Sequence, residues 1–462
     1  MTGSGEQRIL VCGLCPLPFE NTSQNYGPGI RTWQLAKGLA GDGHAVRVIA
    51  MVIPGVYESG ELVEDERVEG IPIRRLDDAA FFDPPVIDRE IESWRPTALV
   101  GATIYGSLAL AQSSSELPFW ADQFGHTMAE AQAKAASENE NWPIPRWWRM
   151  VLPVMSRADR ISVVSRWQRF AAIGELGAIG RLSGETCGYE FTAVIPCGAV
   201  GEPEVGDEDA SPVVRGPHVP ADAFIVLWSG GYNVWSDVDT LFQGLEQAMD
   251  EETSLHFVST GGAIEGHDDT TYARFRRLVS DSSHRSRFHL AGWVKRRLVP
   301  RYVAEADLGV LTDRPMYEGI LGSKNRVVQW MAAGLPAAYN EVGDIGEYLA
   351  EGDLGLTFPV GDAPALAGRL VWAARHPEEL AAMADRAAMA CRRDFALAAT
   401  TAELREWAAE PSHAPDFKPG VARSPFDFEE VPPPVVPPDP IRRSRGLRRR
   451  FAAAVRALLA SQ

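Results

Sequence analysis

The residues Gly322, Ser323, Lys324, Asn325 and Arg326 are consecutive and stand directly before an apolar helical pattern over residues 327–333. The first backbone N–H groups of a helix have no partner within the helix, and the helix dipole makes this end positive. With the Lys324 ammonium and the Arg326 guanidinium, these groups predict a cradle for a diphosphate or a similar anion. The alternative interpretation is a solvated helix start that carries surface charges.

A glycine-rich loop follows the apolar run 224–228 and offers further backbone amides. Gly230 and Gly231 could present these amides to a phosphate group, and the Asn233 side chain could donate a hydrogen bond to it. The loop therefore joins the cradle as a second candidate for anion binding.

His126 stands in the segment 120–130, which follows a short apolar run and opens an alanine-rich helical pattern. An imidazole there could donate to a substrate hydroxyl, and Asp122 or Glu130 could orient it or bind a second substrate. The alternative interpretation is a structural histidine.

Two pairs of residues have side chains that could bind a metal ion, but we interpret both pairs as structural. Asp237 and Asp239 have the spacing of a DxD motif, but acidic side chains also favour the positive end of a helix dipole, and we interpret them as the start of the helix at Thr240. Cys12 and Cys15 form a lone CxxC without the four ligands of a zinc site, and we interpret them as a buried strand end. No metal ion is therefore predicted.

Strands and helices alternate along the part of the chain that carries these residues. The run 9–12, the helical pattern 31–40 and the run 46–53 form a βαβ unit, which implies a parallel sheet with helices on its faces. Further strands are expected at 98–100, 161–164, 224–228, 255–259, 288–290, 308–311 and 336–339. The pattern predicts an α/β protein of two doubly wound Rossmann-like domains, with ligands in the cleft at the carboxyl ends of the strands.

Composition along the chain sets the expected boundaries. Residues 1–204 form the first domain, 205–220 an acidic and then proline-rich linker, 221–410 the second domain, and 411–440 a Pro/acidic linker. Residues 441–462 carry seven arginines, no acid and one apolar stripe, which predicts a basic amphipathic helix. This helix could bind an anionic membrane surface, bind a protein partner, dock on the acidic body of the chain, or remain a disordered tail.

The composition also limits the class of protein. The formal net charge of −17 over 462 residues argues against non-specific binding of nucleic acid, and five scattered cysteines argue against a disulfide framework. No signal peptide and no apolar run of about 18 residues is recognised. A cytoplasmic protein is expected, peripheral at the inner membrane face where the basic tail binds lipid.

Several segments resemble the family-four glycosyltransferases, which are retaining enzymes of the GT-B fold. Residues 25–46 (NYGPGIRTWQLAKGLAGDGHAV) resemble the family's first loop and helix, and residues 194–198 (VIPCG) resemble its V-I-P-N-G hinge with Cys197 in place of Asn. Residues 322–336 (GSKNRVVQWMAAGLP) resemble the P-S-K-x-x-E-Y-M-A-A-G-x-P signature of the branch with a Ser-Lys diphosphate-binding motif. Residues 343–347 and 355–362 follow the family's closing pattern.

The resemblance implies that a hexose-type sugar is moved from a nucleoside diphosphate sugar to a glycan, lipid-linked or small-molecule acceptor. The nucleotide sugar is then a co-substrate, and no other cofactor is expected. His126, Lys324 and Glu318 are the implied catalytic residues, because the family places such groups beside the donor sugar and its diphosphate. Asp122 and Glu130 are implied on the acceptor side.

The resemblance also implies further donor contacts. Gly27 and Gly29 would let the backbone approach the ligand closely, and the loop with Gly262 would touch the phosphate. Trp293 and Val294 would lie against the nucleobase. Ordinary turn chemistry is the alternative explanation for these loops.

Two departures from the family pattern keep other functions open. Gln329 stands where the family commonly has a glutamate that contacts the ribose, and the segment 228–241 lacks the Arg and Lys that many relatives carry there. A catalytically impaired nucleotide-sugar-binding protein and a GT-B nucleotide-sugar epimerase therefore remain as alternatives.

Overall fold

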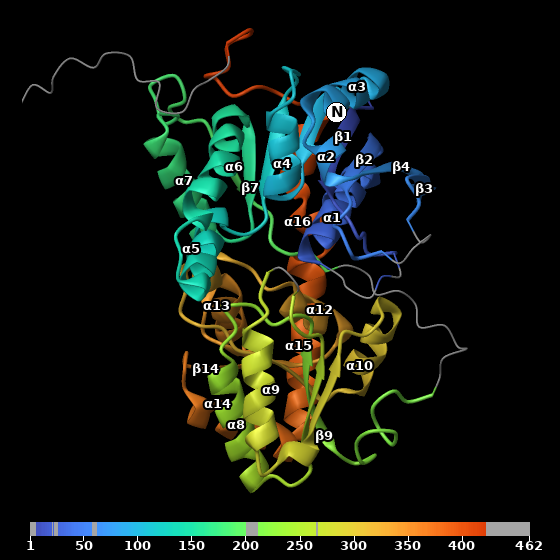
Figure 1. The fold of residues 1–462 in the computed structure, drawn as a ribbon, viewed down its shortest axis with the longest axis vertical. Helices are drawn as coiled ribbons and strands as arrows, with labels where there is room; N and C mark the ends of the chain where they lie inside the picture. The colour runs from blue at the N-terminus through green and yellow to red at the C-terminus, as the bar shows by residue number, and fades with distance from the viewer. Residues whose placement is uncertain are drawn as a thin grey trace, which may run out of the picture. The chain divides into compact units, whose positions relative to one another are not determined.

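The computed structural model describes residues 6–20, 22, 26–57, 62–199, 211–264 and 267–421. Its strands form two sheets in which the pairs are parallel except for one antiparallel pair, β3 with β4, and helices flank both sheets (Figure 1). The structure confirms the predicted α/β class with two Rossmann-like domains.

The N-terminal domain holds an eight-stranded sheet in the order β3-β4-β2-β1-β5-β6-β7-β8. Its strands are β1 (Arg8–Leu14), β2 (Ala45–Met51), β3 (Asp65–Val68), β4 (Ile71–Leu76), β5 (Ala98–Gly101), β6 (Phe119–Gln123), β7 (Arg160–Val163) and β8 (Thr192–Val194). Its helices are α1 (Gly27–Gly41), α2 (Asp78–Phe81), α3 (Pro84–Trp94), α4 (Thr103–Ala111), α5 (Thr127–Glu138), α6 (Pro143–Arg157) and α7 (Arg166–Ala178).

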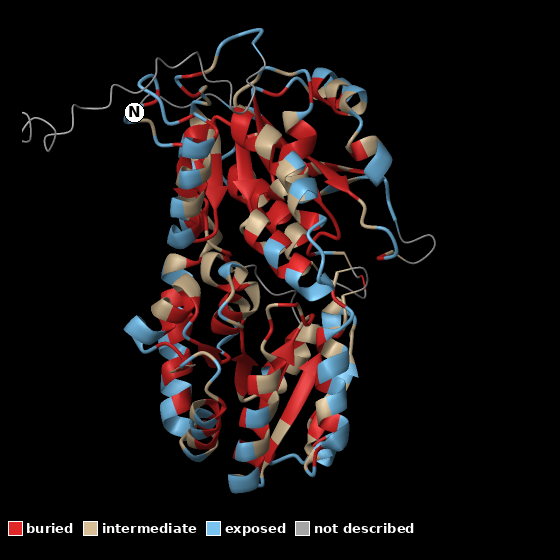
Figure 2. Ribbon diagram, turned by 60° about the vertical axis from the view of Figure 1, so that its left-hand side comes forward, coloured by how far each residue is buried: buried red, intermediate tan, exposed pale blue. Residues whose placement is uncertain are grey.

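This sheet separates two hydrophobic cores, because successive side chains of a strand point to opposite faces. Ile9 and Val11 of β1 join one core, Leu10 and Cys12 join the other, and all four are fully buried. Figure 2 shows the strands buried and the outer faces of the surrounding helices exposed. Burial on both faces is the physical reason why the central strands β1 and β5 read as continuous apolar runs in the sequence.

The C-terminal domain holds a six-stranded parallel sheet in the order β11-β10-β9-β12-β13-β14. Its strands are β9 (Phe224–Ser229), β10 (Leu255–Thr260), β11 (Phe288–Gly292), β12 (Leu308–Leu311), β13 (Ala337–Asn340) and β14 (Leu356–Phe358). Its helices are α8 (Val238–Glu251), α9 (Thr271–Asp281), α10 (Val299–Glu305), α11 (Tyr317–Leu321), α12 (Asn325–Ala333), α13 (Gly343–Gly352), α14 (Ala363–Arg375) and α15 (Pro377–Asp394).

After α15 the chain returns to the N-terminal domain. The helices α16 (Leu397–Thr400) and α17 (Ala402–Ala409) pack against α1, and the indoles of Trp407 and Trp120 lie 5.5 Å apart. Asp416 is buried and accepts hydrogen bonds of 3.1 and 2.9 Å from the Arg181 guanidinium. The second domain expected over residues 221–410 therefore includes two helices that pack on the N-terminal domain. Residues 411–421, expected as part of a linker, pack there as well.

Parts of the expected boundaries lie outside the described residues. These parts are residues 205–210 of the first linker, 422–440 of the second linker, and the basic segment 441–462. Within the described ranges, no helix combines the length and the apolar character needed to cross a membrane.

Candidate functional site

The carboxyl ends of β9, β10 and β11 carry three glycine loops that pack against one another. The Gly230 amide donates to the Thr260 carbonyl at 2.6 Å, and the Gly261 amide donates to the Gly292 carbonyl at 2.6 Å. A Cβ on Gly261 would lie 2.1 Å from the Gly230 carbonyl oxygen, so only glycine fits this close approach. The Gly230 amide, which we expected at a phosphate, is thus engaged with β10 in this structure.

Beside these loops lies the pair expected at the nucleobase. The Trp293 indole donates to the Ala263 carbonyl at 2.8 Å, and a Cβ on Gly262 would lie 3.6 Å from the indole. Val294 follows and is half-buried. The Asn233 amide donates to the Ser236 hydroxyl at 3.2 Å, which shapes the loop before α8.

An ion cluster lies at the same edge of the sheet, after β12. The Lys324 ammonium is 3.1 Å from a carboxylate oxygen of Asp313 and 3.4 Å from one of Glu318, and only 8%, 1% and 13% of these side chains are exposed. Burial disfavours the charged ammonium, but the two carboxylates outweigh this effect and raise the pKa of Lys324. The sequence predicted Lys324 and Glu318 as site residues, and the structure brings them together.

Asp313 is the member of this cluster that the sequence analysis missed. The Tyr339 hydroxyl donates to its carboxylate at 2.9 Å, and the Asp313 amide donates to the Asn340 side chain at 2.9 Å. Asp313 stands two residues after β12, a strand that the apolar run 308–311 predicted. Its place at the carboxyl end of that strand was the available signal.

Arg326 contributes a second cation in the first turn of α12. Its guanidinium lies over the Trp228 ring at 5.0 Å and donates to the Gly231 carbonyl at 2.9 Å. The Nη1 atom of Arg326 is buried and has no hydrogen-bond partner among the described residues. A buried N–H group normally has a partner, so this atom keeps a donor that the described residues do not use.

The start of α12 is also where the two domains meet. A Cβ on Gly27 would lie 3.3 Å from the Asn325 amide nitrogen, and the Gln329 amide donates to the Gly198 carbonyl at 3.1 Å. Ser323 is half-buried, and its hydroxyl lies within hydrogen-bonding reach of the buried Cys197 thiol. These contacts bring Gly27, Ser323 and Gln329 together near the start of α12, and their contacts with a donor stay predictions.

Gly29 serves packing in this structure. A Cβ at this position would lie 1.9 Å from the Pro16 carbonyl oxygen. Only glycine therefore permits the close approach of α1 to the loop after β1. A ligand contact by Gly29 stays a prediction.

His126 caps α5. Its Nδ1 accepts a hydrogen bond from the Ala129 amide at 3.1 Å, so the neutral ring carries its proton on Nε2, which lies 3.2 Å from a Glu175 carboxylate oxygen. Nδ1 is thus used by the helix cap, whereas Nε2 is buried near Glu175 and makes no hydrogen bond among the described residues. A catalytic role for His126 stays a prediction.

Glu130 lies on α5, which packs, like α7, against α11 of the C-terminal domain, the helix that carries Glu318. Burial raises the pKa of Glu130 to about 7, repulsion by Glu318 adds to this effect, and Lys134 opposes it. The side chain remains 34% exposed, and its carboxylate is 4.0 Å from the His267 ring. Glu130 is thus the acidic group that the N-terminal domain contributes beside the ion cluster.

Asp122, also expected on the acceptor side, lies in the interior of the first domain. Its fully buried carboxylate accepts hydrogen bonds from the Arg31 guanidinium at 2.6 and 3.0 Å and from the Ser162 hydroxyl at 2.6 Å. Binding of an acceptor would require this network to open. We therefore correct the expectation to a structural role that joins β6, β7 and α1.

The two aspartates of the DxD spacing belong to α8. Asp237 accepts a hydrogen bond from the Thr240 amide at 3.1 Å as the N-cap, and Asp239 pairs with Arg274 at 2.7 Å in the first turn. This confirms the interpretation as a helix start. Among the described residues, no group of three or more His, Cys, Asp or Glu side chains is arranged to hold a metal ion.

Comparison with known proteins places this geometry in context. Residues 223–376 match the family described as Glycosyl transferases group 1. No curated protein sequence matches the chain.

Solved structures share the fold of almost the whole chain. Sucrose-phosphate synthase from Thermosynechococcus elongatus superposes with a TM-score of 0.62 and 16% identity, over 87% of this chain and 98% of that one. HepE from Anabaena, in complex with UDP and glucose, gives a TM-score of 0.62 and 16% identity over 87% and 99%. An α,α-trehalose-phosphate synthase (UDP-forming) from Burkholderia vietnamiensis gives 0.64 and 12% over 89% and 99%. The chain therefore has the GT-B fold, and its C-terminal Rossmann-like domain matches the Glycosyl transferases group 1 family.

Proposed function

We propose that the chain is a glycosyltransferase that moves a hexose-type sugar from a nucleoside diphosphate sugar to an acceptor, with retention at the anomeric carbon. The observation that carries this proposal is the pair of cations at the start of α12, within the domain that matches the family. Lys324 and Arg326 stand there beside a helix N-terminus and the glycine loops of β9 and β10.

The reaction needs this arrangement because the leaving group is an anion. Breaking the bond between the anomeric carbon and the diphosphate oxygen leaves negative charge on the diphosphate, and positioned cations and N–H groups lower the energy of that state. The buried Nη1 of Arg326 and the first amides of α12 are suited to this task. The Lys324 ammonium, which pairs with Asp313 and Glu318, can also contact the diphosphate and add positive charge there.

The carboxylates of the site suit the sugar. The ion pair with Lys324 holds the Glu318 carboxylate in place. This carboxylate can then accept hydrogen bonds from hydroxyls of the transferred hexose. Glu130 lies across from it on the N-terminal domain, where we assign the acceptor, and His126 at the start of the same helix could contact either substrate. The nucleotide sugar is a co-substrate in this proposal, with no resident cofactor.

The experiment is a binding and turnover assay with a set of donors. We would begin with UDP and UDP-glucose, because HepE is seen with UDP and glucose, and continue with GDP, ADP and dTDP sugars. A thermal shift with one nucleotide, lost in Arg326→Ala, together with donor cleavage, is the expected result. Absence of any shift with all nucleotides would contradict the proposal.

A catalytically impaired nucleotide-sugar-binding protein is the second candidate, and one observation favours it. Lys324 is already neutralised by Asp313 and Glu318, and the segment 228–241 contains no basic residue. Saturable nucleotide binding without donor cleavage, with or without acceptors, would identify this alternative. Release of an epimerised sugar in the absence of acceptor would instead identify an epimerase.

The basic segment 441–462, which lies outside the described residues, allows a test of the class of acceptor. In our proposal a lipid-linked acceptor accompanies membrane binding by this segment. Deletion of residues 441–462 should then abolish sedimentation with vesicles that contain anionic lipid. Sedimentation that persists after the deletion would exclude the segment as the membrane anchor.

A further inference from the structure

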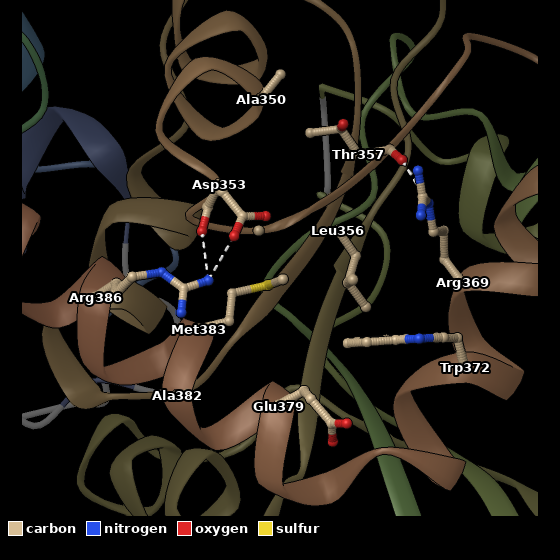
Figure 3. A pocket seen from close by; sticks show the side chains of 11 residues that line it. Ala350, Asp353, Leu356, Thr357, Arg369, Trp372, Glu379, Ala382, Met383 and Arg386 are labelled. Atoms are coloured by element: carbon tan, nitrogen blue, oxygen red, sulfur yellow. Dashed lines mark hydrogen bonds and ion pairs between the residues drawn. The ribbon is translucent and has the colours of Figure 1, made fainter.

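A separate pocket lies on the C-terminal domain. It has a volume of about 520 Å³ and opens between the end of α13, the edge strand β14 and the helices α14 and α15 (Figure 3). The strand contributes its first two residues, Leu356 and Thr357, whereas the ion cluster around Lys324 stands at the carboxyl ends of the strands. The pocket shares no lining residue with that cluster.

The centre of the pocket is an aromatic surface. The indole of Trp372 projects from α14 toward the middle of the pocket (Figure 3). Its ring stacks on His376 with centroids 4.8 Å apart and an interplanar angle of 11°, so one face is covered and the indole is held in place. The buried side chains of Leu356 and Met383 extend the apolar surface.

The wall of the pocket is polar and balanced in charge. Arg386 donates to the Asp353 carboxylate at 2.6 Å, Arg369 donates to the Thr357 carbonyl at 2.9 Å, and Glu379 completes the wall. The formal charges of the two guanidiniums and the two carboxylates cancel, which argues against a phosphate or a cation as the ligand. A guanidinium has five N–H donors, so both arginines keep donors for a ligand beyond these bonds.

We propose that this pocket binds an uncharged hexopyranose unit of a saccharide, and we name it the Trp372 pocket. A pyranose ring offers a face of C–H groups that packs on an aromatic ring, and a rim of hydroxyls that both donate and accept hydrogen bonds. Guanidiniums that donate and carboxylates that accept match this rim. The volume falls within the range of small-molecule sites, about 300–1,000 Å³.

The other class of ligand to consider is an extended peptide, because β14 is an edge strand and could receive one more strand. Two features disfavour it. β14 has only three residues, and the Arg369 side chain already occupies the carbonyl of Thr357, its middle residue. The saccharide therefore fits the observations better, and this inference does not depend on the glycosyltransferase proposal.

The test is a titration of the full-length protein with maltotriose, cellotriose and methyl β-glucopyranoside, followed by ligand-observed NMR. We expect saturable binding of at least one of them, with an affinity at least tenfold lower in Trp372→Ala. Glu379→Ala changes an exposed side chain of the same wall and should weaken binding as well, which covers the case in which Trp372→Ala fails to fold. Trp142→Ala, at an indole that is 41% exposed on the other domain, is the matched control and should bind normally.

Three results would overturn the proposal. The first is no saturable binding of any of the three saccharides. The second is unchanged affinity in both Trp372→Ala and Glu379→Ala. The third is binding that is lost in Arg326→Ala as well, since the saccharide would then occupy the donor site. Nucleotide binding should remain intact in Trp372→Ala, which separates this test from that of the glycosyltransferase activity.

Discussion

Replacement of Lys324 by methionine should affect both stability and ligand binding, and the structure allows the two effects to be separated. The Lys324 side chain is 8% exposed, and its ammonium pairs with Asp313, whose side chain is 1% exposed. Methionine is also unbranched, is one atom shorter than lysine and carries no charge, so the substitution leaves Asp313 and Glu318 without the ammonium that pairs with both of them. Removing one partner of a buried ion pair costs about 3–5 kcal/mol of unfolding free energy.

A second substitution should restore the stability. In Lys324→Met/Asp313→Asn, the three positions carry a formal charge of −1, as they do in the natural sequence. The asparagine oxygen can still accept the hydrogen bond that the Tyr339 hydroxyl donates to Asp313. We expect the double variant to recover about 0.5–3 kcal/mol, the usual coupling energy of side chains in contact. Urea denaturation of the single and double variants measures this cycle.

Nucleotide binding should not recover with the stability. A hydrogen bond to a charged group contributes about 1.5–3 kcal/mol, which corresponds to a loss of roughly 10- to 150-fold in affinity. Isothermal titration of the natural protein and the double variant with the nucleoside diphosphate that binds the natural protein gives the ratio of their affinities. A stable double variant that binds this nucleotide as the natural protein does would refute the diphosphate role of Lys324. An unchanged unfolding free energy in Lys324→Met would refute the buried ion cluster.

Three further predictions concern other groups. Nucleotide-sugar affinity should fall as the pH rises through about 7, because Glu130 then becomes charged beside Glu318, and Glu130→Gln should flatten this dependence in titrations at pH 6 and 8. Gly29→Ala should destabilise the fold by roughly 2 kcal/mol or more in urea, because its Cβ would overlap the Pro16 carbonyl, whereas Gly41→Ala, with open space around it, should not. Burial and the neighbouring His256 lower the pKa of His289 to about 4. Between pH 4 and 6.5 the unfolded state therefore binds more protons than the folded state, so the free energy of unfolding should decrease as the pH is lowered through this window. His289→Phe should reduce that fall in thermal melts at pH 5 and 7.5, and equal slopes would contradict the reasoning.

The sequence predicted the fold well because its signals are local. Most strands of both series appear as apolar runs, since helices cover the sheets and leave these strands little exposed surface, whereas the edge strand β3 (DERV) is partly exposed and carries charged residues. Asp237 and Asp239 were interpreted correctly because a cap depends on residues within one helical turn. The return of α17 was missed for the opposite reason. Leu404, Trp407 and Ala408 form a buried stripe, but such a stripe does not state which sheet it covers.

The candidate site was predicted in part. Lys324 was predicted from the helix start and Glu318 from the family resemblance, but their joint pairing with Asp313 depends on the order of β12 and β13 in the sheet. Asp122 was expected on the acceptor side because it is close to His126 in the sequence. The strand β6 carries Asp122 into the core to meet Arg31 of α1, a contact that no local pattern encodes.

The balance of charge shows how the proposed donor could bind without a basic pair after β9. The formal charges of Asp313, Glu318, Lys324 and Arg326 cancel, so a diphosphate ester with about two negative charges makes the site negative. Burial has already raised the pKa values of Glu318 and Glu130, and an arriving anion raises them further. These two carboxylates are therefore the groups that can take up a proton as the donor binds, and each proton removes a negative charge that an added cation would otherwise have to offset. Proton uptake during binding requires that lower pH favours the complex, which is the direction expected from Glu130.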